Sequence, residues 1–143
     1  MKKFLLATIV LVTLTTAAFA GNNDVLFKSL SSAFKSSTHI VWSKAGDYKL
    51  GTFDFNGKTA NVFYDADNDN LIGYSVHVGL DELPAGTAEN IQKRFNGWAI
   101  TDRILFTDTD GNTGYYVQVT KGKHNIALSV SSKGKAHLFS QMP

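Results

Sequence analysis

Two segments, 53–76 and 117–140, carry the same pattern of apolar and polar positions 64 residues apart. Phe53 corresponds to Val117, and each is followed by further apolar residues at alternating positions. A constant offset between alternating apolar residues indicates one supersecondary unit used twice. The pattern therefore predicts an internal duplication.

The first unit is predicted to begin with an amphipathic helix. Asp24 is a suitable N-cap, and the apolar residues that follow it recur at helical spacing, which predicts a helix over 24–36. Alternating segments then predict strands, and Asn56-Gly57 is the strongest hairpin signal among them, because a type I′ turn needs positive φ at both central residues. The predicted strands are 39–43, 48–55, 59–65 and 71–78.

The second unit repeats this order. Pro84 suits the first turn of a helix that runs to about Asn96, and Gly97 suits its C-cap. Four more strands are predicted at 98–107, 115–120, 125–131 and 135–140. The predicted fold class is α+β: two tandem helix-plus-four-strand repeats, at about 24–79 and 83–140, that form one antiparallel sheet with both helices packed on one face.

Alternation also predicts which strand residues point toward the helices and which point away. The predicted core positions are Phe53, Phe55, Val62, Tyr64, Ile72, Tyr74, Val76, Val117, Val119, Ile126, Leu128, Val130, Ala136 and Leu138. The opposite, open face is predicted to be largely polar, with the aromatic residues Phe63, Tyr116 and Phe139 among its members.

The N-terminal segment is typical of a signal peptide. Lys2 and Lys3 precede the apolar run 4–14, which is too short to span a bilayer, and Ala18-Phe19-Ala20 predicts cleavage after Ala20. The expected organisation is a signal peptide at 1–20 and a single domain at 21–143, in the periplasm or secreted. The sequence contains no cysteine, which excludes a lipoprotein anchor, disulfides and thiolate chemistry.

The balance of basic and acidic residues limits which partners are expected. Removal of Lys2 and Lys3 leaves 12 basic against 12 acidic residues, so the chain lacks the basic footprint of a nucleic-acid-binding protein. From Lys121 onward there are four lysines and no acid. These lysines fit an edge protected from aggregation, or alternatively a rim for an acidic partner.

A set of turn and strand motifs recurs in order along the chain: Phe34, Trp42, the strand pair 53–58 and 62–65, Leu71-Ile72-Gly73, Leu83-Pro84 and Gly134. Through these motifs the chain resembles the PepSY-like family of exported bacterial proteins, whose architecture is similar to the β-lactamase inhibitor protein fold. The resemblance covers nearly all of 21–143 and implies two α-plus-four-strand repeats that share a sheet with an exposed concave face. It also implies binding or inhibition of a partner protein, with peptidases among the candidates.

One loop has the spacing of a calcium site. Asp65, Asp67 and Asp69 occupy positions 1, 3 and 5 of such a loop, but its sixth and twelfth positions are Asn70 and Val76 rather than Gly and Glu. Asp and Asn residues are also typical of a plain hairpin turn. The four histidines, His39, His77, His124 and His137, have no zinc-binding spacing.

The remaining patterns favour binding over catalysis. No serine lies in a nucleophile motif, the only glutamates are Glu82 and Glu89, and no phosphate-binding glycine loop is present. We therefore expect a non-catalytic module without a cofactor that binds a protein or peptide through the open face. The alternative is a periplasmic protein that binds a small molecule or calcium weakly through 65–70. The predicted partner-binding residues are Phe63, His77, Tyr116, Gln118, His137 and Phe139.

Overall fold

The helices follow the predicted amphipathic segments, with one displaced start. The computed structural model describes residues 21–22 and 24–142. In it α2 spans Asp24–Ser36 as predicted, and α3 spans Thr87–Arg94. The prediction that this second helix begins at Pro84 is wrong, because Gly86 adopts the left-handed conformation (φ 83°) and the regular turns start only after it. A short 3₁₀ helix, η2 (Leu80–Glu82), precedes it.

The strands follow the alternating segments of the sequence. They are β1 (Gly21–Asn22), β2 (Val41–Ala45), β3 (Tyr48–Phe55), β4 (Lys58–Asp65), β5 (Leu71–His77), β6 (Ala99–Asp108), β7 (Asn112–Lys121), β8 (His124–Val130) and β9 (Ala136–Met142).

Turn chemistry sets the strand ends. Asn56 and Gly57 both have positive φ, 52° and 81°, which confirms the hairpin between β3 and β4. The predicted strand 39–43 is displaced toward the C-terminus, because a tight turn pairs Ala45 directly with Tyr48.

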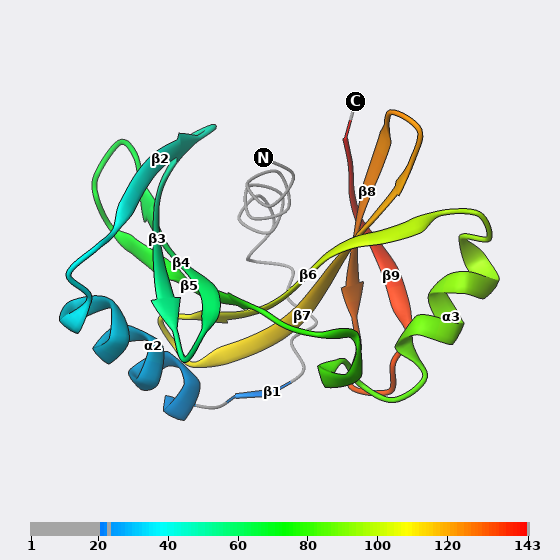
Figure 1. Ribbon diagram of the computed structural model, residues 1–143, viewed down its shortest axis with the longest axis horizontal. Helices are drawn as coiled ribbons and strands as arrows, with labels where there is room; N and C mark the ends of the chain where they lie inside the picture. Colours follow the sequence, from blue (N-terminus) through cyan, green and yellow to red (C-terminus); the bar gives the residue numbers. More distant parts are fainter. Residues whose placement is uncertain (1–20, 23, 143) are drawn as a thin grey trace.

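The sheet is antiparallel, and its strands lie in the order of the chain. Strands β2 to β9 form one continuous ladder, and β1 pairs with β7. Figure 1 shows that the sheet is strongly twisted, with α2 beside β3 to β5 at one end and α3 beside β8 and β9 at the other. The α+β class and the antiparallel sheet are therefore confirmed.

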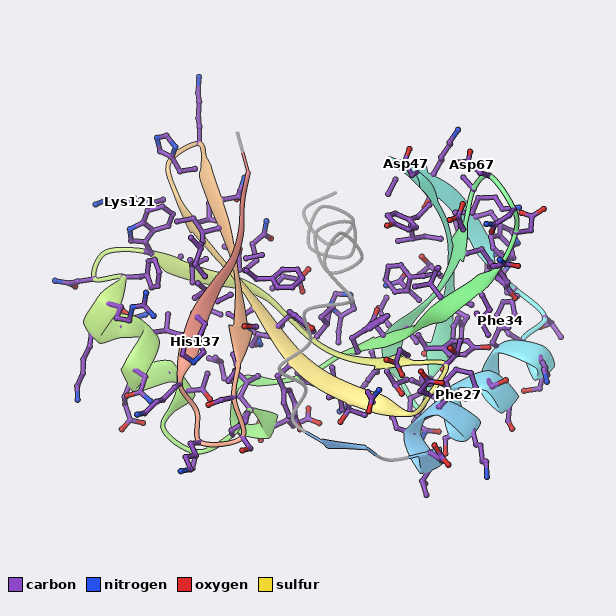
Figure 2. The ribbon with its side chains drawn as sticks, turned by 180° about the vertical axis from the view of Figure 1, so that it is seen from behind. Phe27, Phe34, Asp47, Asp67, Lys121 and His137 are labelled. Carbon is purple, nitrogen blue, oxygen red and sulfur yellow. The ribbon has the colours of Figure 1, made fainter. Side chains whose placement is uncertain are left out.

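Two apolar clusters occupy the two faces of the sheet. The first cluster contains Leu30 of α2, Ile91 of α3 and alternate strand residues such as Val62, Tyr74 and Val117. Phe34 supports it through ring contacts with Trp42, Phe53, Tyr64 and Tyr74, at centroid distances of 5.6 to 6.4 Å. Figure 2 shows Phe27 and Phe34 pointing from α2 toward the strands.

The second cluster consists of strand residues, and its side chains point to the other face. Its buried members are Leu50, Phe63, Ile104, Phe106, Tyr116 and Ala127, and Ala45, Tyr48, Ile72 and Phe139 pack against it. We call the faces that carry the two clusters the first face and the second face.

Two predicted core positions are wrong. Ile72 packs against the second cluster, because a bulge after Phe63 pairs Tyr64 with Leu71 and gives Leu71 the place on the first face. Leu138 pairs with the buried Leu128 but remains 58% exposed. It lies on the edge strand β9, two residues after Ala136, whose carbonyl accepts a hydrogen bond from Arg94 of α3.

The predicted signal peptide and its cleavage site lie outside the described residues. None of the helices in the described part of the chain is long and apolar enough to cross a membrane.

The close pairing of β5 with β6 makes Gly73 a sensitive position. A Cβ at Gly73 would overlap the carbonyl oxygen of Thr107 and lie 2.8 Å from the ring of Phe106. We expect Gly73→Ala to lower the free energy of unfolding by about 2–4 kcal/mol in chemical denaturation. Gly122→Ala is the control: it meets no atom within 4 Å and costs only the strain of positive φ, about 1 kcal/mol. Equal effects of the two substitutions would contradict this account.

Candidate functional site

Strand register places one row of side chains across the second face. Residues directly opposite on neighbouring strands share a face, and the register runs from His77 through Ile104, Tyr116 and Ser129 to His137. The two histidines stand at opposite ends of this row. Four strand spacings separate them by roughly 19 Å, so His77 and His137 cannot share one metal ion.

A buried hydrogen bond between a histidine and a carboxylate lies at the β5 end of this row. His77 Nδ1 is 2.9 Å from Asp102 Oδ1, and the backbone N–H of Arg103 donates to the same oxygen at 2.9 Å. A carboxylate only accepts hydrogen bonds, so Nδ1 carries the proton. In the neutral imidazole Nε2 is then an acceptor.

A bulge brings Asp102 to this position. The pairing of β6 with β7 skips one residue between Ile100 and Asp102. Ile100 therefore packs against the first cluster, whereas Asp102 faces His77 and lies opposite Gln118. The extra residue, Thr101, hydrogen bonds to Thr120 Oγ1 at 2.9 Å.

Four neighbouring polar residues of the second face keep an unpartnered atom. The atoms are Ser75 Oγ, His77 Nε2, Asp102 Oδ2 and Gln118 Nε2, all buried and without a hydrogen-bond partner. We call these four residues the polar patch. A buried polar atom without a partner costs about 1–3 kcal/mol, so the patch retains unused hydrogen-bonding capacity at the centre of the sheet.

The aromatic residues of the predicted binding set flank the polar patch. Phe63 packs edge-on against Phe106 at 5.6 Å, and Tyr116 against Phe139 at 4.9 Å. Phe63 is fully buried and Tyr116 is 4% exposed, because residues of the second face pack against one another instead of standing in solvent. His137 is exposed and Phe139 is half-buried. Figure 2 shows His137 on β9, far from α2.

The acidic loop between β4 and β5 has the contacts of a turn. Asp65 Oδ1 accepts from the N–H of Asp67, and Asn68 Oδ1 accepts from the N–H of Asn70. Asp69 forms an ion pair with Lys49. The described residues contain no group of three or more His, Cys, Asp or Glu side chains that could hold a metal ion.

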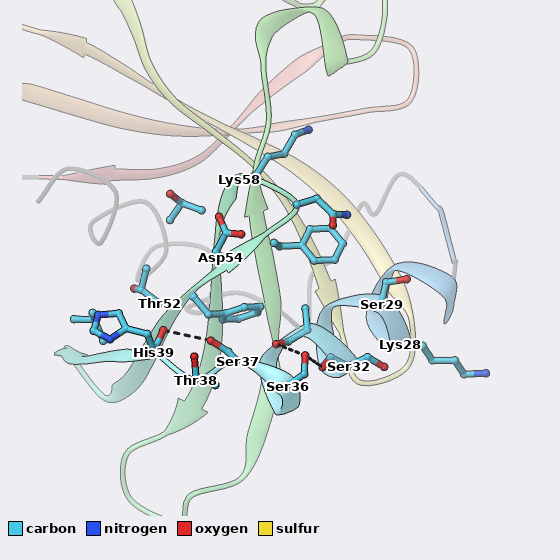
Figure 3. A pocket seen from close by; sticks show the side chains of 16 residues that line it. Lys28, Ser29, Ser32, Ser36, Ser37, Thr38, His39, Thr52, Asp54 and Lys58 are labelled. Carbon is cyan, nitrogen blue, oxygen red and sulfur yellow. Dashed lines mark hydrogen bonds between the residues drawn. The ribbon is translucent and has the colours of Figure 1, made fainter.

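A hydroxyl-lined groove beside α2 was not predicted. It has a volume of about 1050 Å³ and lies between α2 and the β3–β4 hairpin (Figure 3). Ser29, Ser32 and Ser36 line its helical wall, and Asp54 and Lys58 contribute from the hairpin. The spacing of these three serines, which places them on one helical face, was the available sequence signal for this wall. Serines are poor helix formers, so by propensity alone they predict only a weak helix.

The fold has relatives among solved structures. A protein of Bacteroides eggerthii described as periplasmic is 18% identical with a TM-score of 0.60, covering 85% of this chain and 88% of that chain. A BLIP-like protein of Bacteroides fragilis is 20% identical with a TM-score of 0.55, covering 85% and 86%. A DUF2874 family protein of Bacteroides ovatus is 15% identical with a TM-score of 0.58, covering 80% and 82%.

These likenesses define the fold of the chain as BLIP-like. No family model matches the sequence, and no curated protein matches it. Membership of the PepSY-like family therefore stays a prediction.

The burial of Tyr116 has a consequence at high pH. Burial, and secondarily the negative charge of Asp108, raises the pKa of Tyr116 from 10.0 to about 12. Below pH 10 the phenol is neutral in both the folded and the unfolded state, and its contribution to stability is fully present. Between pH 10 and 12 only the unfolded state ionises, so stability is lost as the pH rises. We expect the wild type to lose on the order of 2 kcal/mol relative to Tyr116→Phe over this range. Denaturation of both proteins at each pH measures this loss, and parallel pH profiles would contradict it.

The contacts of the acidic loop predict its response to calcium. Asp65 already accepts a backbone hydrogen bond and Asp69 is paired with Lys49, so we expect calcium to produce neither binding heat nor a rise in melting temperature. Titration calorimetry measures the heat, and magnesium controls for general ionic effects. A calcium-specific rise in melting temperature that Asp67→Asn removes would restore the calcium-binding alternative.

Proposed function

We propose that this chain is an exported, non-catalytic binding module that holds a protein or peptide partner against the second face of its sheet. The observation that carries the proposal is the polar patch, whose four buried atoms have no hydrogen-bond partner. These atoms have no solvent access in the free chain, so the side chains around them must move before a partner can supply matching donors and acceptors and remove this cost.

The chemistry of the polar patch suits a peptide group. Gln118 Nε2 donates, and Asp102 Oδ2 accepts. A peptide group offers one acceptor and one donor, which match these two kinds of atom. The neighbouring half-buried ring of Phe139, which packs against Tyr116, adds an aromatic surface of the kind that is common at binding hot spots.

Two features support a non-catalytic role. His77 and Asp102 resemble the base and orienting acid of a hydrolase, but the nearby hydroxyl of Ser75 makes no hydrogen bond to His77. A nucleophile would need that bond to be activated. The BLIP-like structural relative is also consistent with a protein-binding module.

We propose further that the two halves are copies of one unit. Each half consists of one helix followed by four strands, α2 with β2–β5 and α3 with β6–β9. The participation of Leu30 and Ile91 in the same cluster supports an arrangement with both helices on the first face. This arrangement would leave the second face to the partner.

Export is the remaining part of the proposal. The predicted signal peptide at 1–20 and the periplasmic description of one structural relative support it. Cell fractionation, with sequencing of the mature N-terminus, tests both export and cleavage after Ala20.

Site-specific photo-crosslinking in the producing cells tests the binding face. A photoreactive residue at His137 or Phe139 would project from the second face, whereas one at Leu138 would project from the first face of the same strand. We expect one and the same crosslinked species from positions 137 and 139 and none from the matched control at 138. Equal crosslinking from all three positions, or none from 137 and 139, would contradict the proposal.

A further inference from the structure

Strand β2 ends the sheet with an unpaired edge. Among the described residues β2 pairs only with β3, and Figure 1 shows it at the outer margin of the sheet. The N–H and C=O groups on its outer side therefore have no strand partner. Such an edge is a template for an added strand.

Two exposed apolar residues lie on this edge strand. Val41 is 55% exposed and Trp42 is 51% exposed. The ring of Trp42 is held from one side by Phe34 and Tyr64, at centroid distances of 6.1 and 6.2 Å. The indole is thus fixed in position while half of its surface stays open to a partner.

A small pocket accompanies the edge. It has a volume of about 450 Å³ and is lined by Trp42, Ser43, Lys44 and Lys49, and we call it the edge pocket. The edge pocket therefore combines an aromatic wall and two lysines.

The lysines give the edge pocket its charge preference. Lys44 and Lys49 are directly opposite each other on β2 and β3, an arrangement in which like charges repel. Lys49 is neutralised by Asp69. Lys44 is exposed and has no ion pair within the described part of the chain, so an anionic group beside it would be stabilised.

We propose that β2 binds an extended acidic peptide as an added strand. The peptide backbone pairs with the outer edge of Val41–Ala45, a carboxylate lies beside Lys44, and an apolar side chain two residues away on the same face covers Trp42. A second copy of this chain fits less well, since pairing β2 with β2 would bring together the Lys44 side chains of the two copies without supplying an anion. This site is separate from the proposed partner face and does not depend on it.

The test uses an end-capped peptide of about seven residues in which every second position is alternately glutamate and valine, so that both kinds of side chain lie on one face, with threonine at the positions between them. Trp98→Phe leaves Trp42 as the only tryptophan, so its fluorescence reports binding, and backbone amide shifts report where the peptide lies. We expect saturable binding, shifts centred on 41–45, and loss of binding when lysine replaces glutamate in the peptide. Two peptides test strand addition, one N-methylated on the odd-numbered residues and the other on the even-numbered residues. The peptide whose methyl groups face β2 should lose binding, and the other should keep it.

Lys44→Glu is the decisive variant. Its new carboxylate would face Lys49, so folding is not expected to suffer, and affinity for the acidic peptide should fall roughly tenfold. Lys133→Glu is the matched control, because it makes the same charge change at an exposed turn between β8 and β9 and should leave affinity unchanged.

Three results would overturn the proposal. The first is equal binding by wild type and Lys44→Glu, and the second is amide shifts outside β2 and its neighbours. The third is protection of the β2 amides that grows with protein concentration without peptide, which would assign the edge to a second copy.

Discussion

The register of the antiparallel sheet is the constraint on which the rest of this molecule depends. In a strand, a shift of one residue moves every following side chain to the other face. Three irregularities, after Phe63, Ile100 and Ala127, set the register here. The one after Ile100 is decisive for chemistry, because without it Asp102 would point to the first face and His77 would have no carboxylate.

The same constraint explains how much the sequence could predict. Alternation identified most of the first cluster, the turn chemistry of Asn56-Gly57 located the β3–β4 hairpin, and the amphipathic pattern defined α2. Ile72 was assigned to the wrong face because a bulge leaves no mark in the apolar pattern. The start of α3 was predicted too early because Pro84 is compatible with the first turn of a helix. The left-handed conformation of Gly86 moves the start of the regular turns to Thr87.

The candidate site was less accessible to prediction than the fold. His77, Gln118 and Tyr116 were singled out because they alternate away from the core. Asp102 was missed because its role depends on a bulge and on a partner in another strand. The burial of Phe63 and Tyr116 could not be predicted from alternation either, since it arises from contacts among strands that are distant in the sequence. Edge strand β2 shows the opposite case: its lysine and tryptophan are visible in the sequence, but their exposure follows from its place at the end of the sheet.

The order of the strands has a consequence for how the chain reaches this structure. Every strand from β2 to β9 pairs with its neighbours in the chain, so each pairing closes only a short loop, apart from the longer α3-containing connection between β5 and β6. Short closures cost little entropy, and a topology rich in them favours rapid folding. The sheet can grow from the N-terminal end, hairpin by hairpin, while the C-terminal part is still unstructured. A chain that emerges from a membrane channel N-terminus first could thus assemble this ladder in the order of emergence, without waiting for its last strand.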